Sequence, residues 1–295
     1  FRKRDNLPVI IKARAKKHSF AGKDEEVRWV QNTVTLMHSA AMQSAVIVKI
    51  LEVRESSKSY YIVMERARGV DLFTYFLAAQ KYATAAIIAP AIERVRQVAF
   101  EVLQGISVFH RCNLVHRDLK LENIVLHDNM TPWARSSPMR CSLKLIDFDT
   151  VTEATNNAMH VVGTDQYIAP EAYLGVFSEL TDVFSVGVLL YKLVTYQFPF
   201  REEIFDDAPD DNKAGSPAMA RIRQRMKYAI RNIDWSHADW TANPNAEDFV
   251  KKCLAFLPAQ RMSCQVALQH PWLADYVEER TNMSVSPSGV VGTAS

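Results

Sequence analysis

One eight-residue segment constrains this chain more than any other part of its sequence. Residues 116–123 are His-Arg-Asp-Leu-Lys-Leu-Glu-Asn, and the apolar run Ile124–Leu126 follows directly. Five of these positions match the pattern H-R-D-L-x-x-x-N. With uniform residue frequencies, a chance match somewhere in a chain of this length has a probability on the order of one in ten thousand. The segment is therefore the starting point for interpreting the rest of the chain.

Two further motifs follow it along the chain. Residues 143–149 are Leu-Lys-Leu-Ile-Asp-Phe-Asp, which predicts a short strand followed by the acidic Asp147. Ala169-Pro170-Glu171 then ends a segment that begins with Gly163-Thr164. The order of the three motifs adds to the information that each carries alone.

The sequence before and after Asp71 has different periodicity. Before it, short β-branched runs predict three strands, at 8–13, 47–53 and 60–64. Helical spacing predicts one helix at 25–37, between the first two strands. After it the pattern is mainly helical, with a long core helix over 92–109. The first part therefore predicts a small sheet, and the second a helical body.

Two later segments have distinct patterns. A second buried helix is predicted to begin near Thr181, with Thr181 and Asp182 as its capping residues. Residues 201–217 are acidic and polar and contain two prolines, so we expect an exposed loop there.

Composition excludes several classes of protein. The 35 Lys and Arg nearly balance the 33 Asp and Glu, so charge gives no support for a nucleic-acid or membrane-surface partner. The four cysteines are scattered without metal-ligand spacing. The apolar stretch Ala83–Ala91 is far shorter than the roughly 20 residues of a membrane span, and Phe1–Asp5 does not resemble a signal peptide. We expect an intracellular, cytoplasmic protein with no membrane segment.

On these motifs the chain resembles the eukaryotic protein kinases over about residues 1–275, specifically serine/threonine kinases of the calcium/calmodulin-dependent group. Lys120, two residues after Asp118, and Gly163-Thr164 are typical of the serine/threonine type. The resemblance implies an α+β, two-lobed fold. Its predicted parts are a small β-rich N-lobe, incomplete here, at 1–66, a larger, mainly α-helical C-lobe at 67–275, and a tail at 276–295.

The same resemblance implies ATP and Mg²⁺ as cofactors and protein substrates with Ser or Thr acceptors. Phosphoryl transfer mainly requires groups that position the reactants and neutralise phosphate charge. Asp118 would orient the acceptor hydroxyl and take its proton, and Lys120 would stabilise the transferring phosphate. Asn123 and Asp147 would hold magnesium through hard oxygen ligands. Lys12 would contact the α- and β-phosphates.

The resemblance also implies an adenine pocket. Met64 would be the gatekeeper, the backbones of Glu65 and Ala67 would face adenine, and Val125 would form the floor. A lone lysine on a strand, such as Lys12, more often extends to water, and only its place in the motif order favours function.

Other family positions are expected to be structural. His116 is predicted to pack, Glu171 and Arg261 to form a buried ion pair, and Asp182 to anchor the 116–123 loop.

Several positions depart from the family. The glycine-rich phosphate loop is not among these residues, and Asp149 stands where the family usually has glycine, which permits a wider range of backbone angles. The helix carboxylate that should pair with Lys12 is not identified: Glu26 lies early, and Gln31 carries no charge. These departures keep open a pseudokinase that regulates or scaffolds without turnover.

Further expectations concern activation by phosphorylation and the choice of substrate. His160 occupies the usual activating phosphosite, so we expect Arg117, which normally grips that phosphate, to be served by another group. Glu122 and Asp71 match acidic positions that hold arginines upstream of the acceptor in basophilic relatives. No calcium-binding loop pattern is present in these residues, and a regulatory domain or partner is expected, if at all, outside them.

Overall fold

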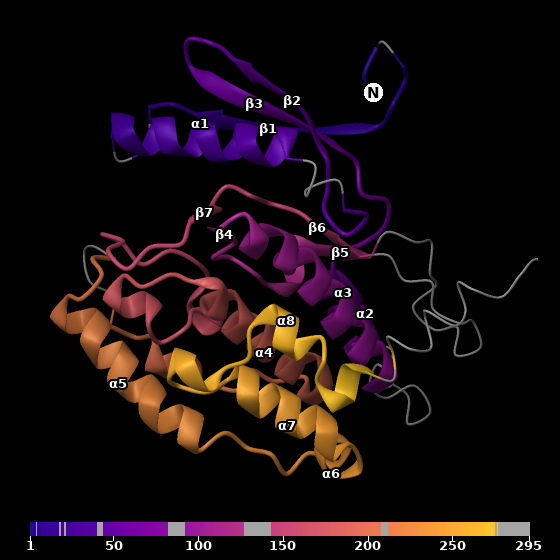
Figure 1. Cartoon of the computed structure of the whole chain (residues 1–295), viewed down its shortest axis with the longest axis vertical. Helices are drawn as coiled ribbons and strands as arrows, with labels where there is room; N and C mark the ends of the chain where they lie inside the picture. Colours follow the sequence, from indigo (N-terminus) through magenta and orange to yellow (C-terminus); the bar gives the residue numbers. More distant parts are fainter. Residues whose placement is uncertain are drawn as a thin grey trace, which may run out of the picture.

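A computed structural model describes residues 1–3, 5–17, 19–20, 22–39, 44–81, 92–126, 143–207, 212–274 and 276. Figure 1 shows a sheet and one helix above a larger helical part. The strands are β1 (Val9–Ala15), β2 (Ile50–Glu55), β3 (Ser59–Glu65), β4 (Leu114–Val115), β5 (Ile124–Leu126), β6 (Leu143–Leu145) and β7 (Thr152–Glu153). The α-helices are α1 (Lys23–His38), α2 (Leu72–Lys81), α3 (Ile92–Arg111), α4 (Glu179–Thr195), α5 (Pro217–Arg231), α6 (Ala238–Ala242), α7 (Pro244–Cys253) and α8 (Cys264–Ala267). Short 3₁₀ turns are η2 (Leu121–Asn123), η3 (Asp165–Tyr167), η4 (Ala172–Leu174), η5 (Glu202–Ile204) and η6 (Pro258–Gln260).

The three predicted strands form one antiparallel sheet in the order β1-β3-β2. The central strand β3 buries Ile62 and Val63, because it has neighbours on both edges. The predicted helix is α1, whose buried side includes Trp29 and Leu36. The Trp29 ring lies 5.3 Å from that of Tyr60 on β3, so aromatic packing fixes the helix against the sheet.

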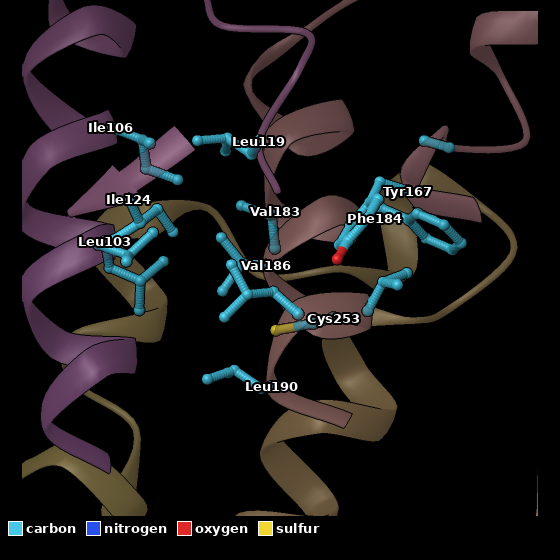
Figure 2. Close-up of a cluster of buried hydrophobic side chains, with 14 of the residues drawn as sticks. Leu103, Ile106, Leu119, Ile124, Tyr167, Val183, Phe184, Val186, Leu190 and Cys253 are labelled. Carbon is cyan, nitrogen blue, oxygen red and sulfur yellow. The ribbon is translucent and has the colours of Figure 1, made fainter. Parts of the chain in front are cut away.

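The larger part is built around α3 and α4. The predicted apolar face of α3 is buried, and α4 is buried on nearly every side. Figure 2 shows side chains of the two helices in one apolar cluster, namely Leu103, Ile106, Val183, Val186 and Leu190, together with Cys253 of α7. A Cβ on Gly187 would lie 2.8 Å from the Cβ of Cys253, so only glycine allows α4 and α7 to pack this closely.

The predicted second buried helix is confirmed as α4, which begins two residues before Thr181, but its N-cap was predicted wrongly. The helix begins at Glu179 with Ser178 as N-cap, and its first turn has a capping box in which Thr181 Oγ1 accepts a hydrogen bond from the Ser178 N–H at 3.0 Å. Thr181 therefore takes part in the cap from inside the helix. Asp182 does not cap, because its carboxylate is used by a distant loop.

The expectation of an exposed loop at 201–217 was only partly right. Phe205 is buried, and the turn η5 precedes it. At the other end, the N–H of Val161 donates to the carbonyl of Asn212 at 2.7 Å, and the N–H of Ala214 donates to that of Met159 at 2.9 Å. The loop is therefore a backbone support for the segment around residue 160.

A short stretch before β2 joins the sheet to the larger part. The N–H of Val48 donates to the carbonyl of Leu145 on β6 at 3.0 Å, and the N–H of Leu145 donates to the carbonyl of Val46 at 2.7 Å. This pairing connects the sheet to the two-stranded sheet of β5 and β6, which follows the 116–123 loop. Within the described residues no helix combines the length and apolarity that crossing a membrane requires. Apart from Tyr276, whose ring lies 5.2 Å from that of Phe100, the predicted tail is outside the described residues.

Candidate functional site

The 116–123 loop is held in place from below by one buried carboxylate. Asp182 Oδ2 accepts a hydrogen bond from the N–H of His116 at 2.9 Å, and its Oδ1 accepts one from the N–H of Arg117 at 3.0 Å. His110 Nε2 lies 2.9 Å from the same carboxylate. Burial alone would raise the pKa of Asp182, but the hydrogen bonds and charge of His110 hold it below its ordinary value. The predicted anchoring role of Asp182 is confirmed.

Replacing Asp182 with Asn is expected to lower the free energy of unfolding at pH 7 by about 1.5–3 kcal/mol, because charge-assisted hydrogen bonds are lost. A carboxyl with a depressed folded-state pKa stabilises the fold above its unfolded-state pKa, about 3.9, and loses that contribution as the pH falls through the folded-state value. The difference between wild type and variant should therefore shrink below about pH 4. Urea unfolding at several pH values measures this, with the exposed Asp206→Asn as control. A difference that stays constant with pH would contradict the assignment.

Four polar side chains form a closed network above this anchor. Thr164 Oγ1 donates to Asp118 Oδ1 at 2.8 Å, and Lys120 Nζ donates to Thr164 Oγ1 at 2.9 Å. Lys120 Nζ also lies 2.9 Å from Asp118 Oδ2, and the Asn123 amide nitrogen donates to that oxygen at 3.1 Å. These contacts hold the Asp118 side chain in one orientation. Because the side chain is 16% exposed, a ligand can still reach it.

Thr164 is a site residue that the sequence interpretation did not assign, although it noted the Gly163-Thr164 pair. Gly163 has a φ of +129°, and a Cβ there would lie 2.7 Å from the carbonyl oxygen of Arg117. Glycine is therefore required for the segment to approach the loop closely enough to place Thr164 beside Asp118.

The two predicted metal ligands lie at the ends of adjoining strands, because Asn123 directly precedes β5 and Asp147 lies two residues after β6. The N–H of Ile146 donates to the carbonyl of Asn123 at 2.9 Å, which places Asp147 one residue beyond this contact. The Asn123 amide nitrogen is used by Asp118, whereas its amide oxygen accepts no hydrogen bond from the described residues. Among those residues no group of three or more His, Cys, Asp or Glu is arranged to hold a metal. One amide and one carboxylate oxygen fit magnesium, which usually takes few protein ligands and keeps phosphate oxygens and waters.

Lys12 lies against the segment that contains Asp147. Its Nζ is 2.6 Å from Asp147 Oδ1 and 2.8 Å from Asp149 Oδ2. Burial alone would lower the pKa of Lys12, but the hydrogen bonds that it donates to both carboxylates raise its pKa above the ordinary value. Burial likewise opposes ionisation of Asp147, yet the hydrogen bond and charge of Lys12 leave the pKa of Asp147 lowered. The structure therefore places Lys12 in an ion-paired site and not in bulk water.

Neither helix candidate is the partner of Lys12. Glu26 accepts a hydrogen bond from the Tyr60 hydroxyl at 2.8 Å, and Gln31 is exposed. On α1, Asn32 is turned inward and donates to the carbonyl of Val151 at 3.2 Å. The carboxylates that pair with Lys12 come from the segment after β6. A search for acidic residues on the predicted helix therefore could not find them.

Met64 and Val125 are both buried, as expected of side chains that would line an adenine pocket. The β1–β3 register pairs Lys12 with Ile62 and Ile10 with Met64, so Met64 lies on the same face of the sheet as Lys12. Val125 is the middle residue of β5 and pairs with Lys144 of β6.

Glu65 and Ala67 lie at and just after the end of β3. The N–H of Glu65 donates to the carbonyl of Lys49 at 3.0 Å, and the Glu65 carboxylate lies 2.6 Å from Lys144 Nζ. In the described chain, neither the N–H nor the C=O of Ala67 bonds another backbone group, so both can serve a ligand.

Arg117 has partners within the protein. Its Nε donates to the carbonyl of Thr150 at 2.6 Å, and its guanidinium carbon lies 5.2 Å from the centre of the Phe177 ring. Burial lowers the pKa of Arg117 to about 10. His160 forms a backbone bridge with Lys213. The Thr150 carbonyl and the Phe177 ring are therefore the alternative partners expected for Arg117 when His160 occupies the usual phosphosite.

His116 packs as predicted. Its ring is fully buried, 5.8 Å from that of Phe109 and 6.0 Å from that of Phe148. Burial lowers the pKa of His116, which favours the neutral ring. The contact with Phe148 connects the loop to the segment that contains Asp147.

The chain is similar in sequence to one family model and to several known kinases. The family model described as "Protein kinase domain" matches residues 1–273. The serine/threonine-protein kinase PKZ1 of Phytophthora infestans is 29% identical over 77% of this chain and 54% of its own length. Calcium-dependent protein kinase 4 of Plasmodium falciparum is 29% identical over 89% of this chain and 44% of its own length. A calcium and calcium/calmodulin-dependent serine/threonine-protein kinase of Lotus japonicus is 29% identical over 77% of this chain. The chain spans about half the length of the first two of these curated relatives.

Proposed function

The chain belongs to the protein kinase domain family, and from this premise we propose that the protein is a serine/threonine kinase. It transfers the γ-phosphate of ATP to Ser or Thr hydroxyls of protein substrates. The observation that carries the proposal is the network of Asp118, Lys120 and Thr164, in which a carboxylate is oriented beside a cation. The serine/threonine kinases among its relatives support the choice of acceptor.

The proposed roles follow from the contacts. Asp118 accepts the proton of the substrate hydroxyl, since Thr164 already shows that one of its oxygens accepts from a hydroxyl. Lys120 stabilises charge on the transferring phosphate. Asn123 and Asp147 would hold magnesium, which when bound neutralises charge on the nucleotide phosphates.

Nucleotide binding is proposed on the opposite side, toward the sheet. Lys12 binds the α- and β-phosphates with a charge that its neighbouring carboxylates maintain. Met64 and Val125 enclose the adenine, and the backbones at Glu65 and Ala67 bind its edge.

The test is phosphate transfer from magnesium-ATP to a basic serine peptide by the whole protein, with Asp118→Asn as comparison. A pseudokinase that regulates or scaffolds, the rival interpretation, would transfer no phosphate. The complete set of Lys12, Asp118, Asn123 and Asp147, and a carboxylate partner for Lys12, support turnover.

We also propose that substrates carry basic residues upstream of the acceptor. Asp71 accepts hydrogen bonds from the N–H and the hydroxyl of Thr74 at the start of α2, both at 2.8 Å, so it acts as a helix cap. Glu122 is exposed and forms no hydrogen bond or ion pair with another described residue. Glu122, two residues after Lys120, is therefore the better partner for a substrate arginine.

Glu122→Gln is expected to raise KM for an arginine-containing peptide about two- to fivefold, the size of an exposed ion pair. KM for the same peptide with alanine in place of arginine should not change. Initial rates with both peptides measure the effect. Equal changes for the two peptides would contradict a charge contact.

A further inference from the structure

Two cations of β1 hold Asp149. Lys12 Nζ lies 2.8 Å from Asp149 Oδ2, and Arg14 Nη1 donates to the Asp149 carbonyl at 3.2 Å. Lys12 and Arg14 are two residues apart and so project from the same face of the strand. Arg14 is itself fixed, because its guanidinium lies over the Phe20 ring at 4.3 Å and donates to the Ser19 carbonyl at 2.8 Å.

The backbone accepts a side chain at this position. Asp147 has a φ of +63°, whereas Asp149 is not among the described residues with positive φ. A glycine is therefore not required at Asp149, and its carboxylate is present without backbone strain. Replacement of the usual glycine by Asp149 therefore leaves the local backbone conformation unstrained.

Lys12 needs a carboxylate partner other than Asp147 if Asp147 is to hold magnesium. Kinases of this family pair the strand lysine with a helix glutamate and use the first aspartate of the 147–149 motif for magnesium. Here Glu26 bonds Tyr60, and both carboxylates that pair with Lys12 lie in the 147–149 motif. When Asp147 holds magnesium, Asp149 is the remaining counter-charge for the lysine.

We propose that Asp149 is a positioning residue that takes the place of the helix glutamate and orients Lys12 toward the nucleotide phosphates. The proposal rests on the nucleotide site of the proposed function. It follows that the lysine is ordered by the magnesium-binding segment and by β1, and does not depend on a carboxylate of α1.

The test compares ATP with adenosine, which lacks the phosphates that Lys12 would bind. Asp149→Asn is expected to weaken binding of magnesium-ATP about tenfold and leave adenosine binding unchanged. Asp149→Glu should retain most of the ATP affinity. Glu153→Gln, an exposed carboxylate of the same segment, is the matched control and should bind both ligands as wild type does. Calorimetry measures each dissociation constant.

A second measurement needs no ligand. Unfolding free energies of wild type, Lys12→Met, Asp149→Asn and the double variant form a cycle, and a favourable coupling between the two positions is expected. Equal losses of ATP and adenosine affinity, unchanged or tighter ATP binding in Asp149→Asn, or zero coupling would each overturn the proposal. Failure of the kinase function is separate, because it appears as wild-type protein that binds ATP but transfers no phosphate.

Discussion

Replacing Asp118 with Asn is expected to lower kcat for phosphate transfer by about 10²–10⁴-fold, the usual contribution of a positioned general base. Asparagine has the same shape and still accepts a hydrogen bond from Thr164, but it has neither the charge nor the basicity of the carboxylate. Initial rates with magnesium-ATP and a basic serine peptide measure the change. Nucleotide binding should be nearly unaltered, because Asp118 is assigned to the hydroxyl and not to the phosphates.

Two comparisons make the Asp118 result specific. Urea unfolding of Asp118→Asn should show a stability close to wild type, and Asp206→Asn, an exposed carboxylate outside the site, should keep full activity. Undiminished transfer by Asp118→Asn would exclude Asp118 as the base. A wild-type protein that binds ATP and transfers nothing would favour the pseudokinase.

Replacing Arg261 with Met is expected to lower the free energy of unfolding by about 3–5 kcal/mol. Arg261 Nη1 and Nη2 lie 2.6 and 2.8 Å from the two oxygens of Glu171, and both residues are buried, which confirms the predicted ion pair. Arg261 Nε also donates to the carbonyl of Ala255 at 2.7 Å. Removing the arginine leaves a buried carboxylate without its counter-charge, and this is the main cost. Urea unfolding at pH 7 measures it.

The matched control is Arg231→Met at the exposed end of α5, which should change stability by less than about 0.5 kcal/mol. The double variant Glu171→Met with Arg261→Met should recover part of the loss, because no unpaired charge remains. Recovery should be incomplete, since Arg261 also serves backbone carbonyls. A loss below about 1 kcal/mol in Arg261→Met would show that the pair does not stabilise the fold.

The sequence by itself predicted the three-stranded sheet, the helices α1, α3 and α4, and most of the residues of the candidate site. Helical periodicity identified α1 and α3, because one face of α3 is buried over most of its length and one face of α1 is buried from Trp29 to Leu36. The 116–123 motif identified Asp118, Lys120 and Asn123, because they lie on one short loop whose spacing is local. The long-range pairs Glu171–Arg261 and Asp182 with the 116–123 loop were also predicted, but from the family resemblance and not from local pattern.

The tertiary structure alone decided the contacts that depend on how distant segments meet. Ser178 and not Asp182 caps α4, because Asp182 is buried under the loop and its carboxylate satisfies two backbone N–H groups there. Thr164 reaches Asp118 because Gly163 permits a close backbone approach. Lys12 takes its second carboxylate from Asp149, far away along the chain. Helix and strand periods report which face of an element is buried, but they carry no information on which charged group from another element will occupy the space beside it.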